Sequence, residues 1–258
     1  MKYVFSLLIC LLPLLATAKS WQISSPEHQM ALLELFTSEG CGRCPPAEQW
    51  VAQLPQLGID EQRLIVLAFH VDYLDEQKGW VDAFARPEFT ARQRQLARLN
   101  LFQTIFTPEF VLSGEVVHNW RQHLQDVVLF VNDLQPEADI ALQVEHDENG
   151  QQLLVDTHVL VKGEHNQLHS SLYLAVKQNN LQSHVIAGDN AGQHFNHQHV
   201  VRRWLGPYPL DREMLVSVEI PVENDWQLDQ VTVVAVVQNL SDAFVLQAVA
   251  LPLENQGN

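Results

Sequence analysis

Two cysteines separated by two residues are the clearest chemical feature of the chain. The sequence holds three cysteines, and two of them, Cys41 and Cys44, enclose Gly42 and Arg43. A disulfide across so short a loop constrains the unfolded chain very little, so its value is chemical rather than mechanical. The pattern therefore predicts thiol-disulfide exchange, in which one thiolate attacks a disulfide sulfur and the second thiol releases the product.

The flanking sequence assigns different roles to the two cysteines. Residues 30–36 form a continuous apolar run typical of a buried strand. Residues 45–54 predict a helix, which tolerates proline in its first turn. Backbone N–H groups at the start of a helix favour a thiolate over a thiol. Cys41 is therefore predicted to be the nucleophile, and Cys44, one turn later, to be the more buried resolving cysteine.

Other uses of the same cysteines stay open at this point. An inert bridge is one alternative, and a structural zinc site is another, although zinc needs two further ligands and the sequence has no second C-x-x-C. His194, His197 and His199 have a spacing that can bind copper or zinc by imidazole. The sequence does not show that these three side chains converge, so we predict no bound metal and no other cofactor.

The elements that position the cysteines predict a mixed α/β region followed by a β region. Residues 63–69 form a second apolar strand, and the order strand, helix, strand implies a right-handed crossover between parallel strands. Residues 87–99 and 119–134 have helical spacing, and residues 107–112 begin another strand. Beyond Pro136, short strands follow one another, starting with a hairpin around Asn149-Gly150. This series of short strands predicts an antiparallel sandwich resembling an immunoglobulin-like domain.

The N-terminal eighteen residues and the net charge limit location and partners. MKYVFSLLICLLPLLATA has a basic start, an apolar run and a small-x-small end, so it predicts a secretory signal peptide cut after Ala18. We therefore expect a periplasmic or secreted protein. The apolar run is shorter than the ~20 residues that span a bilayer, so no membrane span is predicted. A net charge of −16 opposes binding to nucleic acid.

Several segments resemble a known family. LLELFTSEGCGRCPPAE, LAFHVDYLDEQKGWVDAFARPEFTARQRQLAR and FTPEFVLSG are similar to the secreted bacterial domain-of-unknown-function 1223 family. The resemblance resumes at DNAGQHFNHQHVVR and VVAVVQNL. That family is assigned to the thioredoxin-like superfamily. The resemblance implies a thioredoxin-like α/β N-terminal domain. Together with the strand pattern beyond Pro136, it predicts an α/β thioredoxin-like domain over residues 19–135 followed by an all-β, immunoglobulin-like sandwich domain over residues 136–258.

The resemblance also implies roles for individual residues. Cys41 and Cys44 match the redox pair, and Pro108 matches a cis-proline that faces it. A cis Thr107-Pro108 bond would expose backbone next to the sulfur, where a substrate peptide could pair. Glu34 matches the buried acid that exchanges a proton with the resolving cysteine. The chain has no Trp before Cys41 and carries Gly-Arg between the cysteines, so the redox direction stays open.

Further polar residues leave the second predicted strand at its carboxyl end. His70 and Asp72 lie there, at the edge where open α/β sheets place ligands. We predict that both contact substrate, as Thr107 does, and a role as loop anchors remains the alternative. Two sets of nearby residues are predicted to be structural: the aromatic residues Trp80, Phe84 and Phe89 as a satellite core, and Arg92, Arg94 and Arg98 as a solvated helix face.

These observations favour an exported thiol-disulfide oxidoreductase that acts on protein thiols or disulfides without a bound cofactor. Two alternatives remain. One is a non-catalytic envelope module for binding or assembly, because fold alone does not certify activity. The other is a copper-handling protein that uses the cysteines and histidines.

Overall fold

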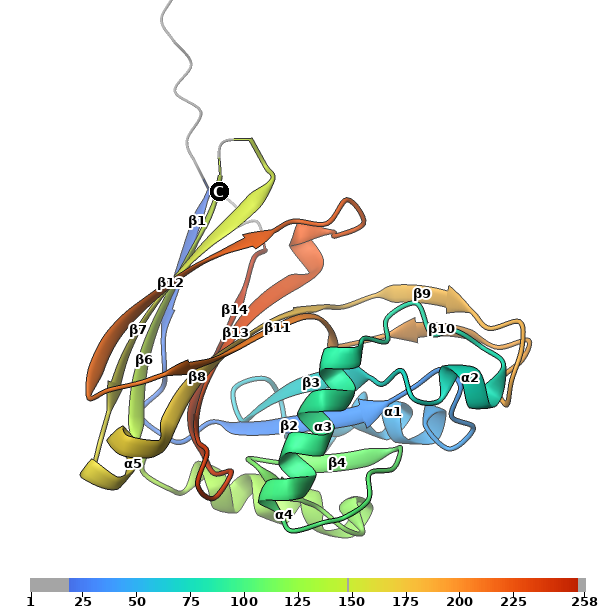
Figure 1. Cartoon of the computed structure of the whole chain (residues 1–258), viewed down its shortest axis with the longest axis horizontal. Coiled ribbons are helices and arrows are strands. Elements are labelled where there is room, and N and C mark those ends of the chain that lie inside the picture. Colours follow the sequence, from blue (N-terminus) through green and yellow to red (C-terminus); the bar gives the residue numbers. More distant parts are fainter. Residues whose placement is uncertain (1–18, 148, 255–258) are drawn as a thin grey trace, which may run out of the picture.

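The structure is a computed structural model that describes residues 19–147 and 149–254, so the predicted signal peptide lies outside the described residues. The strands form two large β-sheets and a short hairpin (Figure 1). The smaller sheet has the strand order β1-β6-β7-β12, and the larger sheet has the order β14-β13-β8-β11-β3-β2-β4-β5. Strands β9 and β10 pair as the hairpin.

The elements follow one another along the chain with these bounds. The strands are β1 (Ser20–Ser24), β2 (Ala31–Thr37), β3 (Leu64–His70), β4 (Glu109–Leu112), β5 (Glu115–Val116), β6 (Ala138–His146), β7 (Gln152–Val161), β8 (Ser170–Gln178), β9 (Leu181–His184), β10 (His194–His197), β11 (Val200–Pro209), β12 (Glu213–Pro221), β13 (Val231–Asn239) and β14 (Val245–Pro252). The α-helices are α1 (Pro45–Val51), α2 (Asp75–Lys78), α3 (Pro87–Leu99), α4 (Trp120–Asn132) and α5 (Glu164–His169). Two short 3₁₀ helices cover Leu54–Leu57 and Leu228–Gln230.

The predicted division into a thioredoxin-like α/β domain and a separate immunoglobulin-like sandwich is wrong. The described chain is predominantly β, and its larger sheet combines strands from both predicted domains. Strand β11 pairs antiparallel with β8 and parallel with β3, where Val200 lies opposite Ala68. Ser20–Ser24, which lie before the first predicted strand, form β1, and β1 pairs with β6. Pairings between such distant segments leave no local pattern in the sequence, and for this reason the division failed.

The buried residues of the larger sheet show how the layers are arranged. On β2, Leu32 and Phe36 face one side and pack with α3, whereas Leu33 and Leu35 face the other side and pack with α1 and α4. The α3 side continues along the sheet to Tyr173 on β8. At the far end of the α1 side, the smaller sheet covers β8, β13 and β14 (Figure 1). Helices therefore flank the β3-β2-β4 part, while the smaller sheet covers one face of the β8-β13-β14 part.

Local predictions around the cysteines are confirmed. Strands β2 and β3 are parallel, with Ala31 opposite Leu64 and Thr37 opposite His70, and α1 connects them. Helix α3 has the predicted bounds, and α1 begins as predicted but ends earlier, at Val51. Across residues 19–147 and 149–254, the structure contains no helix with the length and apolar character that crossing a membrane requires.

Candidate functional site

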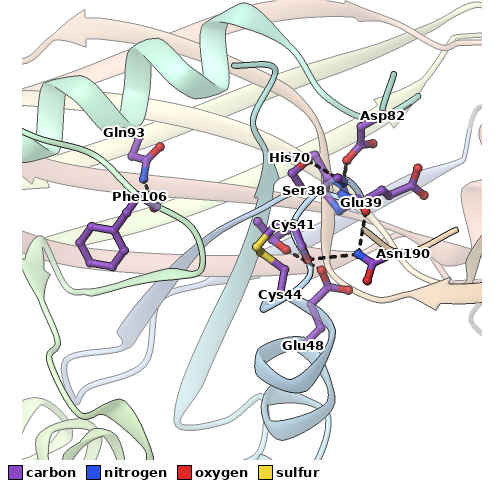
Figure 2. The surroundings of a disulfide bond; sticks show 12 residues. Ser38, Glu39, Cys41, Cys44, Glu48, His70, Asp82, Gln93, Phe106 and Asn190 are labelled. Atoms are coloured by element: carbon purple, nitrogen blue, oxygen red, sulfur yellow. Dashed lines mark hydrogen bonds and ion pairs between the residues drawn. A yellow bond between two sulfur atoms is a disulfide. The ribbon is translucent and has the colours of Figure 1, made fainter. Parts of the chain in front are cut away.

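The Cys41–Cys44 disulfide lies in the turn between β2 and α1 (Figure 2). The two Cα atoms are 5.4 Å apart. The Cys41 N–H donates to the Ser38 carbonyl at 3.0 Å, and the Cys44 N–H donates to the Cys41 carbonyl at the same distance. Cys41 is 6% exposed and Cys44 is fully buried. Cys41 is therefore the more accessible of the two cysteines, and Cys44 is the more buried, as predicted.

Five ionisable side chains gather beside the disulfide, and we call them the acid–histidine cluster. They come from the β2–α1 turn, α1, the end of β3, the segment before α3 and β10. The members are Glu39, Glu48, His70, Asp82 and His197. Figure 2 shows four of them, Glu39, Glu48, His70 and Asp82, on one side of the disulfide. Strands β2 and β3 end at the same edge of the sheet. The polar segments that follow these two strands therefore meet at that edge.

His70 and Asp82 form a buried pair within this cluster. His70 Nδ1 lies 2.7 Å from Asp82 Oδ2, and both side chains are almost completely buried. Burial by itself would raise the pKa of Asp82, but the attraction and hydrogen bond of His70 outweigh it and lower that pKa. His70 Nε2 is also buried and has no hydrogen-bond partner within the described part of the chain. The imidazole is thus fixed at one nitrogen and unsatisfied at the other.

His197 lies between two glutamates of the cluster. Its Nδ1 is 2.9 Å from Glu48 Oε2, and its Nε2 is 3.1 Å from Glu39 Oε1. Burial opposes a charged His197, but the hydrogen bonds of Glu39 and Glu48 raise its pKa to about 9. Burial would likewise raise the pKa of Glu48, yet His197, His70 and Thr37 lower it overall. A protonated His197 between two carboxylates is the state favoured at neutral pH.

Neighbouring groups hold the cluster and the disulfide turn together. Asn190 Nδ2 donates to the carbonyls of Glu39 at 2.7 Å and Cys41 at 3.1 Å, as Figure 2 shows. Trp80 Nε1 donates to Glu39 Oε2 at 2.7 Å. The Phe84 ring packs against both histidines of the cluster, with its centroid 5.5 Å from that of His70. Trp80 and Phe84 therefore line the cluster, whereas Phe89 is a core residue as predicted.

Two predicted site residues lie elsewhere. Glu34 faces α3, on the opposite side of β2 from α1, where both carboxylate oxygens accept hydrogen bonds from Arg92. It is therefore not the acid beside Cys44, and Arg92 is buried rather than part of a solvated helix face. Arg94 and Arg98 are exposed, as predicted. Asp72 accepts a hydrogen bond from Thr90 of α3 and stays outside the cluster, which instead contains Asp82.

The Thr107-Pro108 peptide bond is cis, as predicted. It directly precedes β4, whose first residue, Glu109, lies opposite Phe36 of β2. The bond thus lies at the end of β2 that leads into the cysteine turn. Thr107 is buried, and the neighbouring Phe106 is 45% exposed, with its carbonyl held by Gln93 (Figure 2). A contact between this segment and a substrate stays a prediction.

The three histidines considered for a metal site do not converge. His194 is exposed and stacks on His184 of β9 with ring centroids 4.0 Å apart. His199 approaches Lys177 at 3.3 Å, and its burial lowers its pKa to about 3. Only His197 of the three joins the cluster. His194, three residues earlier on β10, faces the opposite side of the strand, and His199 lies beyond the end of β10 with a positive φ of 58°.

Sequence reasoning missed Glu39, Glu48 and Asp82 as members of the site. Glu48 had a detectable signal, since it lies one helical turn after Cys44 and i,i+4 neighbours share a helix face. Glu39 lies two residues before Cys41, so its proximity to the cysteines is also evident from the sequence. Asp82 follows β3 by twelve residues, and only the folded loop brings it to His70.

The fold and site define a β-rich protein whose larger sheet carries a C-x-x-C disulfide beside buried acids and histidines. The chain belongs to the family described as a protein of unknown function (DUF1223), whose family model matches residues 32–238. This membership confirms the predicted family.

Solved structures with a similar fold include two bacterial proteins. HBP35 of Porphyromonas gingivalis is 16% identical, with a TM-score of 0.69 over 91% of this chain and 79% of that chain. Protein AGR_C_4864 from Agrobacterium tumefaciens is 22% identical, with a TM-score of 0.61 over 91% of this chain and 98% of that chain. At these identities the likeness concerns the fold alone. A search of the curated proteins finds no match.

Proposed function

We propose that the chain is an exported thiol-disulfide oxidoreductase that exchanges disulfides with protein partners through Cys41 and Cys44. The disulfide itself carries this proposal, since it joins a slightly exposed Cys41 to a fully buried Cys44 in a short turn. The ionisable cluster beside it supports the proposal, because thiol exchange needs proton donors and acceptors. Export rests on the predicted signal peptide, and sequencing the N-terminus of the mature protein, expected at Lys19, tests it.

The exchange has two steps. In the reduced protein, the Cys41 thiolate attacks one sulfur of a partner disulfide, forming a Cys41–partner bond and releasing one partner thiolate, which takes up a proton. The Cys44 thiolate then attacks the Cys41 sulfur, closing the internal disulfide and releasing the second partner thiolate. The partner gains two electrons and the protein loses two. Run in reverse, the same steps oxidise a partner dithiol.

Glu48 takes the proton-transfer role that sequence reasoning gave to Glu34. The Glu48 N–H donates to the Cys44 carbonyl at 3.1 Å. The spacing of four residues places both side chains on one face of α1. Glu48 is also hydrogen-bonded to His197, so it belongs to a network through which the Cys44 proton can leave.

Single-cysteine variants and a synthetic peptide disulfide test the proposal. We expect reduced Cys44→Ser protein to retain the peptide as a mixed disulfide, because the resolving thiol is absent. We expect Cys41→Ser to react at least about tenfold more slowly, because Cys44 is buried in the native fold. Urea-unfolded samples of both variants are the matched control and are expected to react alike.

The opposite results have a clear meaning. Equal rates for the two folded variants would contradict the catalytic function, and so would a wild-type rate no higher than that of a small-molecule thiol. Either result would favour the non-catalytic binding or assembly module. The direction of exchange follows from the reduction potential of the pair. A value near about −270 mV indicates a reductant, and a value near about −120 mV indicates an oxidant.

A further inference from the structure

The acid–histidine cluster contains a set of groups suited to holding a metal ion. Glu48, His70 and His197 each offer one ligand atom, and these three atoms lie within 4.8 Å of one another. His70 and His197 are buried, and Glu48 is partly exposed. His70 Nε2 is the second, independent observation, because it is a buried nitrogen with no hydrogen-bond partner among the described residues. A bound cation would satisfy this atom.

From this geometry, we propose that Glu48, His70 and His197 bind a divalent transition-metal ion through one carboxylate oxygen and two imidazole nitrogens. Two imidazoles and one carboxylate suit ions such as zinc, and three protein ligands leave one position open. The inference goes beyond the proposed thiol exchange and needs no cysteine ligand. Neither Cys41 nor Cys44 belongs to the set.

The outer partners of both histidines support this assignment. Imidazoles that bind metals usually direct their other ring nitrogen to a carboxylate, which fixes the ring orientation. His70 Nδ1 has Asp82 at 2.7 Å, and His197 Nε2 has Glu39 at 3.1 Å. The nitrogens left for the ion are therefore His70 Nε2 and His197 Nδ1. Glu48 already lies 2.9 Å from the second of these atoms.

The outer carboxylates are themselves held in place. Asp82 Oδ2 also accepts the Glu39 backbone N–H at 2.8 Å, and Asp82 Oδ1 accepts the Phe84 N–H at 2.9 Å. Trp80 donates to the second oxygen of Glu39. Both acids are thus held in place before an ion binds, so binding requires little further ordering of these side chains.

Two of the three proposed ligands also border a cavity. Glu48 and His197 line a cavity of about 210 Å³, which is bordered by α1, β2, β3 and the β10 segment. Zinc binds nitrogen and carboxylate oxygen at about 2.0–2.2 Å, so the three ligand atoms must draw together when the ion enters. His197 Nδ1 then loses its proton to solvent, and the hydrogen bond between His197 and Glu48 is replaced by two bonds to the ion.

The experiment uses the oxidised full-length mature protein after treatment with a chelator. Zn²⁺ is titrated in competition with a chelating dye, and we expect one equivalent to bind. His70→Gln and His197→Gln should each weaken Zn²⁺ binding by at least about tenfold, while Asp82→Asn, a change to an outer partner, should weaken it by about 10–100-fold. His194→Gln is the matched control, because this exposed histidine stacks on His184 outside the cluster, and Zn²⁺ affinity should not change.

A second measurement covers variants that fail to fold, as judged by thermal unfolding. Co²⁺ bound to oxidised wild-type protein should give ligand-field absorption bands without thiolate charge-transfer bands. Three results would overturn the proposal: no binding by the oxidised wild type, binding that appears only after reduction, or wild-type affinity in folded His70→Gln. The thiol-exchange tests use reduced protein, so the two proposals fail independently.

Discussion

The molecule has two buried groups of ionic side chains, one on strand β2 and one just beyond its end. They differ in how many of their polar atoms have hydrogen-bond partners. On the α3 side, Arg92 donates to both oxygens of Glu34 at 2.7 and 2.8 Å, and its guanidinium also lies 4.9 Å from the ring centroids of Tyr173 and Trp204. Beyond the end of β2, the acid–histidine cluster borders a cavity and contains a His70 nitrogen with no hydrogen-bond partner in residues 19–147 and 149–254.

The difference separates a structural role from a chemical one. The Glu34–Arg92 pair is closed, since Gln238 accepts a further Arg92 hydrogen bond at 2.9 Å and the side chains are buried. A closed pair has no free position for a ligand or a proton. Burial of charge alone therefore does not mark a functional site, whereas buried polar atoms that lack partners call for an explanation.

Breaking the closed pair should have the largest effect on stability. Arg92→Met leaves the Glu34 carboxylate buried without its partner, and loss of one member of a buried pair costs about 3–5 kcal/mol. We expect this loss in the free energy of unfolding, measured by urea denaturation. Arg94→Met on the exposed side of α3 is the matched control and should stay within about 0.5 kcal/mol of the wild type.

Removing both charges sharpens the result. The double variant Glu34→Leu/Arg92→Met should lose less stability than Arg92→Met alone, because no uncompensated charge remains. An Arg92→Met protein as stable as the Arg94→Met control would show that the pair is not the closed structural group described above.

The acid–histidine cluster should instead make the free energy of unfolding of the metal-free protein depend on pH. His197 has its pKa raised from 6.5 to about 9, so the folded state binds its proton more tightly than the unfolded state. The resulting stability, on the order of 3 kcal/mol, is fully present below pH 6.5 and is lost as the pH rises through 9. Urea denaturation between pH 6 and 10 in the presence of a chelator measures it.

Two variants isolate the contribution of His197. His197→Gln should remove most of this slope between pH 6.5 and 9, whereas His194→Gln should retain it, since His194 is exposed and outside the cluster. A wild-type slope that survives in His197→Gln would assign the pH dependence to another group.

Asn190 tests the smallest effect, the link between the cluster and the disulfide turn. Asn190→Ala leaves the buried carbonyls of Glu39 and Cys41 without these hydrogen bonds, at a cost of about 1–3 kcal/mol. We also expect faster reduction of the disulfide by dithiothreitol, because the turn is less firmly held. Asn196→Ala, at an exposed position on β10, is the control, and an equal reduction rate in both variants would contradict the link.

Prediction from the sequence succeeded where signals are local. The apolar runs and proline positions predicted the β2-α1-β3 unit and its cysteines, and the helical spacing predicted α3 with its observed bounds. It failed for Glu34 because strand alternation gives two faces without saying which face α1 covers. It failed for Asp82 because a loop, with no periodicity, sets that position. The two-domain prediction failed because β3 and β11 pair across the middle of the chain.

The parallel contact between β3 and β11 also has consequences for how the chain folds. The central strands β2 and β3 appear early in the sequence, yet β3 obtains its outer neighbour only when β11 has been made. Near the two ends of the described chain, the Trp21 indole N–H donates to the Glu254 carbonyl at 3.0 Å. Folding that depends on contacts between distant residues is slow, because long loops must close before those contacts form. An N-terminal fragment that stops before β8 would leave one edge of its sheet unpaired, so a nascent chain exposes this edge until synthesis is nearly complete.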